Sequence, residues 1–247
     1  MAIPPDDLEG WLELSRARLL QMPPREGLAE LKALLEGWLD HRHFVAGDDD
    51  GLAQAFSRHF FDHVRTAMGS AEMRPWHEYL ADDPAPVARF YELFARFAAD
   101  PAHRGKATPR PPPRPEPALT RPSLLETLQG FRTPENRPGT GDIASLQSFC
   151  QGWAAHCKAV PFAHDPFARE FFTSFDPWLA WATGSRRQGD WAAQIAAVAG
   201  DEEPYAVFFR LLERYRRRLR DIVDKWSPAL GDSVVPDRFQ PGGAAKT

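Results

Sequence analysis

The sequence predicts an all-α protein built of two homologous helical bundles, an internal duplication joined by a Pro-rich linker. Three observations predict this class. Apolar residues recur at three- and four-residue spacing, no stretch alternates as a strand would, and the second half of the chain repeats the first. The predicted organisation is a first unit at 1–100, a linker at 101–122, a second unit at 123–230 and a flexible tail at 231–247.

An N-terminal helix is predicted near 6–21, and each unit then reads as four helices, of which the third is short. In the first unit the apolar stripes consist of Leu28, Leu31, Leu34, Leu35 and Trp38, then Phe56, Phe60 and Val64, then Phe90, Leu93, Phe94 and Phe97. Asp50, Asp83 and Asp165 each precede a glycine or proline at a helix start and are predicted N-caps.

The duplication is visible when residues 146–195 are aligned with residues 31–80 at an offset of 115 positions. At an offset of 118 the match resumes and includes Asp83 with Asp201 and Phe90 with Phe208. Residues present in both copies are expected to serve a structure or function that the two units share. They include Gly37 and Gly152, Trp38 and Trp153, His41 and His156, Phe60 and Phe175, and Trp76 and Trp191.

The boundary between the units is the segment "DPAHRGKATPRPPPRPEPALTRP" at 100–122. Each proline removes a backbone donor and restricts the residue before it, so neither helix nor sheet can run through the segment. It reads as a semi-rigid spacer of polyproline type. Its PxxP spacing and arginines leave open a role as a ligand for an aromatic-lined groove.

Charge is distributed unevenly along the chain. Residues 1–100 carry 10 Lys and Arg against 18 Asp and Glu, a net charge of −8 within a total of −4. An acidic body attracts basic partners and disfavours nucleic acid and membrane surfaces. The clusters "GDDDG" and "ADDP" therefore provide the candidate partner-binding residues, Asp48, Asp49, Asp82 and Asp83.

The N-terminus has no pattern of a signal peptide, and no apolar run is long enough to span a membrane, so we expect a cytoplasmic protein with no membrane partner. No phosphate-binding loop, nucleophile elbow or kinase motif occurs. We therefore expect no enzymatic activity and no cofactor.

The stretch "FCQGWAAHCKAV" at 149–160 contains both cysteines of the chain and His156. Cys150 and Cys157 correspond to Leu35 and Arg42 in the first unit, so a site that uses both thiols could exist only in the second. A zinc site needs four ligands in recognisable pairs, and these are missing. Packing is the favoured role, no metal site is predicted, and an enzyme that uses Cys157 and His156 remains an alternative.

Two further patterns have a structural interpretation. His59 and His63 have the i, i+4 spacing of a metal-binding helix, but the glutamate of the metalloprotease pattern is absent, and packing is favoured. The arginine-rich segment "LLERYRRRLRDIVDKW" at 211–226 keeps an apolar stripe, so its arginines are predicted to form the solvated face of a docked helix.

The order of short sequence features within each unit supports a resemblance to a known family. Each unit has "GW" on its first helix, a phenylalanine-rich second helix before Gly-Ser, then a tryptophan, and finally an acidic cap before "FYELFARF" or "FFRLLERY". In this order of features the chain resembles small helical immunity proteins encoded beside secreted bacterial toxins. The likeness covers roughly 31–98 and 146–219, and it transfers no binding residue. Tandem copies depart from the usual single domain.

The resemblance and the acidic first unit predict a non-catalytic binding module, an immunity protein that neutralises a basic toxin domain by covering its active face. The alternative is a helical scaffold or regulatory adaptor, in which the Pro-rich linker or the basic C-terminal helix binds a partner.

Overall fold

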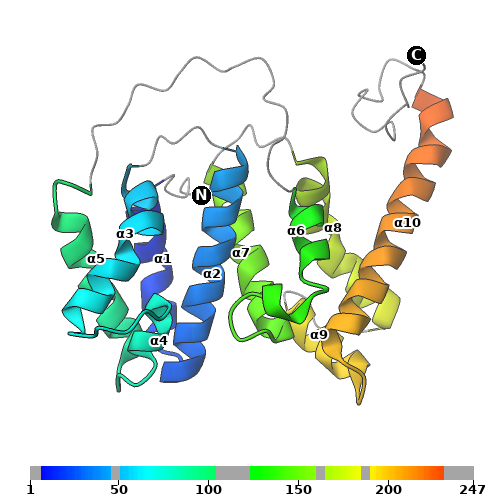
Figure 1. Cartoon of the computed structure of the whole chain (residues 1–247). Coiled ribbons are helices and arrows are strands. Elements are labelled where there is room, and N and C mark those ends of the chain that lie inside the picture. The colour runs from blue at the N-terminus through cyan, green and yellow to red at the C-terminus, as the bar shows by residue number, and fades with distance from the viewer. Residues whose placement is uncertain (1–6, 46–50, 104–122, 160–164, 185–189, 231–247) are drawn as a thin grey trace, which may run out of the picture.

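The computed structural model describes residues 7–45, 51–103, 123–159, 165–184 and 190–230. Over these residues the chain forms ten α-helices, one short 3-10 helix and no strand, which confirms the predicted all-α class (Figure 1). Most of the predicted linker and all of the predicted tail at 231–247 lie outside the described residues.

Five helices come from the first half of the chain and five from the second. The predicted N-terminal helix is α1, and the short third helix of the first unit is α4. The bounds are α1 (Leu8–Leu19), α2 (Pro24–Val45), α3 (Gly51–Ala67), α4 (Trp76–Leu80), α5 (Pro86–Ala99), α6 (Leu124–Gly130), η1 (Pro134–Asn136), α7 (Ile143–Ala159), α8 (Pro166–Thr183), α9 (Trp191–Ala199) and α10 (Pro204–Leu230).

Each half has its own aromatic core. In the first, the rings of Phe56 and Phe60 stack with centroids 4.4 Å apart, and Phe97 of α5 meets Phe60 edge-on at 5.4 Å. In the second, Phe171 stacks on Phe175 at 4.6 Å. These rings are buried in the cores of their halves, where each removes a large apolar area from water.

Helix starts follow the predicted capping at one position and depart from it at another. Asp165 caps α8, since its Oδ1 accepts from the amide of Ala168 at 2.9 Å. The prediction that Asp83 caps the last helix of the first unit is wrong, because α5 begins at Pro86 after an N-cap at Ala85. Asp83 instead accepts the amide of Ala85 in the turn before the helix. Asp50 lies outside the described residues.

Helices α2 and α7 pack against each other and join the two halves at the centre of the molecule (Figure 1). A β-carbon on Gly37 would overlap the carbonyl of Phe149, and one on Gly152 would overlap the carbonyl of Leu34. The backbones of the two helices are therefore in direct contact at this crossing, where only glycine fits.

Candidate binding surface

The predicted residue Asp83 lines a surface hollow in the first half. The hollow measures about 410 Å³ and lies between the end of α3 and the first turns of α5. Its lining residues are Met68, Asp83, Ala85, Ala88, Arg89 and Glu92. Asp83 is held in place because Ala85 donates its amide to the carboxylate at 2.8 Å. The neighbouring side chain of Asp82 is exposed.

The loop that leads into the hollow is fixed by Tyr79. Its hydroxyl donates to the carbonyl of Glu72 and accepts the amide of Arg74 at 3.0 Å. The guanidinium of Arg74 also lies over the Tyr79 ring, 5.6 Å from its centroid. The same loop leaves the side chain of Met73 72% exposed.

The charge of this region is negative. Residues 68–92 contain five acidic residues and two arginines, a net charge of −3. His77 does not offset it, because burial and the charge of Lys32 lower its pKa to about 4. Hydrogen bonding from Arg89 lowers the pKa of Glu92, which keeps that carboxylate ionised. We call Met68, Asp82, Asp83, Arg89 and Glu92 the acidic surface.

The two other predicted partner-binding residues, Asp48 and Asp49, lie outside the described residues. The structure therefore locates two of the four predicted residues on one exposed surface and leaves the other two as a prediction.

His41 and His156, the histidines at matching positions of the two predicted units, meet at the crossing of α2 and α7. Nδ1 of His41 lies 2.7 Å from Nδ1 of His156, and Nε2 of His41 lies 3.0 Å from Sγ of Cys157. Both imidazoles are buried. Trp38 lies edge-on to His156 with centroids 4.7 Å apart, and Trp153 lies against His41 at 5.2 Å. These side chains link the two halves.

The electrostatics of this cluster favour neutral groups. Burial, reinforced by the nearby His156, lowers the pKa of His41 to about 3. Burial also raises the pKa of Cys157 to about 12, with a further contribution from Asp165. A thiol with such a pKa is a poor nucleophile near neutral pH, since the thiolate is the reactive form. The alternative pairing of Cys157 with His156 did not anticipate the close contact with His41 from the first half.

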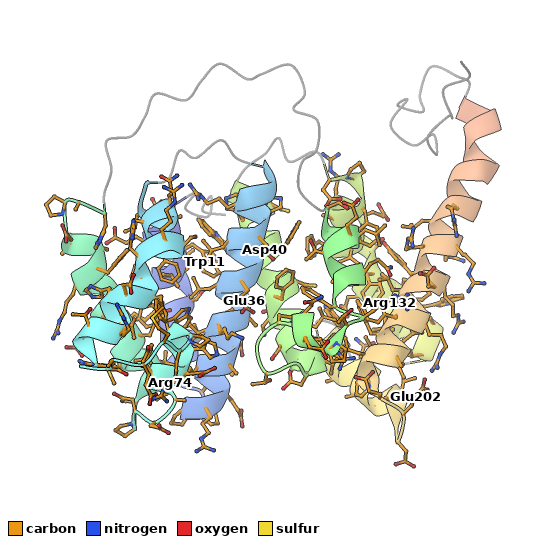
Figure 2. All side chains as sticks on the ribbon, in the orientation of Figure 1. Trp11, Glu36, Asp40, Arg74, Arg132 and Glu202 are labelled. Atoms are coloured by element: carbon orange, nitrogen blue, oxygen red, sulfur yellow. The ribbon has the colours of Figure 1, made fainter. Side chains whose placement is uncertain are left out.

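A second set of contacts fixes a loop of the second half on α2. Lys32 donates to the carbonyl of Gly139 at 3.0 Å, and Gly139 donates its amide to Glu36 at 3.1 Å. Figure 2 shows Glu36 on α2, in front of α7. Sequence reasoning missed this junction. The signal that could have indicated it is a glycine within a helical pattern, Gly37 and Gly152, at matching positions of the two predicted units.

The remaining candidates serve packing. His63 is half-buried, with the carbonyl of Leu93 as a hydrogen-bond partner, and His59 is exposed. No group of three or more His, Cys, Asp or Glu side chains within the described ranges is arranged to hold a metal ion.

A second hollow lies between η1 and α10, but its charges are already matched. Arg132 lies over the ring of Phe209 and reaches Glu213, while Arg137 pairs with Glu203. Arg210 makes two hydrogen bonds to Glu202. Figure 2 shows Arg132 and Glu202 on this side of the molecule. In the first hollow Glu92 is likewise paired with Arg89 and Arg96, but Asp82 and Asp83 form no ion pair with a described side chain, so the acidic surface is the better candidate for a basic ligand.

Comparisons with protein-family models, with curated proteins and with solved structures found no match. Within the part of the chain that the structure describes, no helix is both long and apolar enough to cross a membrane.

Proposed function

We propose that this chain is a non-catalytic binding protein that neutralises a basic partner, such as a toxin domain, through its first half. The observation that carries the proposal is the position of Asp82 and Asp83 beside a hollow that also contains Met68 and Glu92. Carboxylates around an apolar contact fit a partner surface that is rich in Lys and Arg.

The chemistry of this surface is that of recognition. Glu92 is already paired with Arg89 and Arg96, so the exposed carboxylate of Asp82 and the partly exposed carboxylate of Asp83 are the groups that steer a basic protein toward the surface and mainly raise the association rate. The apolar side chain of Met68 supplies adaptable contact area once the partner has docked. A protein bound over the hollow would cover the partner's active face, which is how an immunity protein acts.

Two observations support a non-catalytic role. The histidines and the half-buried cysteine with catalytic potential lie at the joint between the halves, and burial shifts the pKa values of His41 and Cys157 toward their neutral forms. The acidic surface contains no histidine, cysteine or serine next to the hollow.

The proposal also includes the origin of the two halves. We infer that the chain arose by duplication of one helical unit, and the contact between His41 and His156, which are 115 positions apart, supports this. The two copies share residues of the joint and differ in surface charge. The proline-rich segment at 101–122 would then be the spacer between the copies, and the cytoplasm of a bacterium would be the place where it acts.

The experiment is co-purification of the tagged full chain from its native host, followed by mass spectrometry. We expect a stable partner with a basic domain, and we expect the variant with both Asp82→Lys and Asp83→Lys to recover much less of it. A partner that is neutral or acidic would contradict the proposal and would favour the adaptor.

A further inference from the structure

The exposed face of α10 is strongly basic. Residues 210–220 contain six arginines and one glutamate, a net charge of +5. Arg210 and Arg216 pair with Glu202 and Glu213. Arg214 and Arg217, in contrast, are exposed and form no ion pair with any side chain that the structure describes. Their charges are therefore available to a partner.

An exposed tryptophan lies beside these arginines. Trp181 of α8 is 70% exposed, and the guanidinium of Arg218 lies over its ring, 5.2 Å from the centroid. Arg214 and Arg218 are one turn apart on α10, so they project on the same side. Tryptophan and arginine are the residues that most often dominate binding energy at protein interfaces. We call Trp181, Arg214, Arg217 and Arg218 the basic surface.

We propose that the basic surface of one copy of this chain binds the acidic surface of a second copy. The two surfaces have opposite charge, and each includes an exposed apolar side chain, Trp181 on one and Met68 on the other. Residues 68–92 have a net charge of −3 and residues 210–220 a net charge of +5. The total charge of −4 is small for 247 residues, so repulsion between whole molecules is weak.

The geometry makes this contact intermolecular. Helices α3, α4 and α5 lie on one side of the molecule and α10 lies on the other, with α2 and α7 between them (Figure 1). The acidic and basic surfaces of one chain are thus too far apart to meet. A symmetric contact of either surface with itself would bring like charges together. The association is therefore head-to-tail, the arrangement that grows into rings or open chains.

This inference uses the same acidic surface as the proposed function but does not require the basic partner. A basic partner would compete with the second copy for Asp82 and Asp83. Variants of the basic surface separate the two ideas, because they affect self-association and leave the acidic surface unchanged.

The test is sedimentation equilibrium of the full chain at several concentrations, in low and in high salt. We expect the average mass of the wild type to rise above 27.8 kDa with concentration in low salt and to return to it in high salt. Arg214→Glu with Arg217→Glu, and separately Asp82→Lys with Asp83→Lys, should each weaken association about tenfold or more. A mixture of these two variants should associate again, since it keeps one native pair of surfaces.

A charge-matched control is Arg25→Glu with Arg58→Glu, two exposed arginines outside both surfaces, which should associate as the wild type does. Trp181→Ala should weaken association without changing its salt dependence. A wild type that stays at 27.8 kDa at every concentration, or a mixture that stays monomeric, would overturn the inference. Binding of a single-stranded oligo(dT) that depends on Arg214 and Arg217, in a monomeric wild type, would overturn it in favour of nucleic acid.

Discussion

Cys157, His41 and His156 form a buried series of hydrogen bonds that needs no charged group. Either the thiol of Cys157 donates to Nε2 of His41 and Nδ1–H of His41 donates to Nδ1 of His156, or both bonds run in the opposite direction. In either arrangement a protonated His41 would place a positive charge in a buried site, which is costly. The packing of α2 on α7 therefore depends on a neutral His41.

This arrangement predicts a loss of stability in mild acid. The pKa of His41 is about 3 in the folded protein and about 6.5 when exposed, so the unfolded chain binds the proton first as pH falls. The stabilisation is complete above pH 6.5 and declines between 6.5 and about 3. From pH 6.5 to pH 5, His41 alone should remove about 2 kcal/mol from the free energy of unfolding.

Urea unfolding at several pH values checks this. His41→Gln should be less stable than the wild type at pH 7, and its stability should change less between pH 7 and pH 5. An equal pH dependence of the two proteins would show that His41 is not the group responsible.

For single residues, the sequence identified the important positions more accurately than it predicted their roles. It identified His41 and His156 as the repeated polar pair and favoured packing for both cysteines, and both thiols are free, with Cys150 buried. It could not show that residues 115 positions apart touch, because aligning the two halves of the sequence pairs similar residues without locating them in space.

Among the helices, the contact between α2 and α7 is the feature that tolerates least change. A methyl group on Gly37 or Gly152 would overlap the backbone of the opposite helix, and a backbone atom cannot rotate away as a side chain can. Each of Gly37→Ala and Gly152→Ala should therefore destabilise the protein by about 3 kcal/mol, measured by thermal or urea unfolding.

Gly130→Ala is the matched control. Gly130 ends α6, and a β-carbon there would meet nothing within 4 Å. This variant should unfold within about 1 kcal/mol of the wild type. If alanine at position 37 or 152 were as well tolerated as at position 130, the backbone contact of the two helices would be refuted.

Helices were predictable here because their apolar spacing is regular, whereas their ends were less so. Asp165 precedes Pro166 and caps α8 as predicted. Asp83 precedes Pro84 in the same way, yet a second proline, Pro86, begins α5. With two prolines so close, the pattern does not determine which one occupies the first turn of the helix.

For the whole molecule, the two aromatic cores and the α2–α7 contact between them predict how the chain responds to cleavage. Limited proteolysis should cut between about 100 and 125, in the proline-rich segment. The two fragments should remain helical by circular dichroism and stay together on size exclusion, because separation would expose the buried Trp38, His41, Trp153 and His156. Fragments that separate and stay folded would contradict the importance of the α2–α7 contact.

Most of the candidate site follows from charge, which the sequence supplies directly. The excess of acid in residues 1–100 and the cluster at Asp82 and Asp83 are visible without coordinates. The hollow, the packing of Met68 against it and the exposure of Trp181 beside the arginines of α10 depend on how distant helices pack, and periodicity alone does not determine that.

The most direct measurement is the association rate of the purified chain with its captured partner, across a range of salt concentrations. Exposed charges are screened beyond about 8 Å at physiological ionic strength. Association should therefore slow markedly as salt rises while dissociation changes little, and Asp82→Lys with Asp83→Lys should reproduce much of that slowing at low salt. An association rate that is insensitive both to salt and to this double reversal would contradict the account.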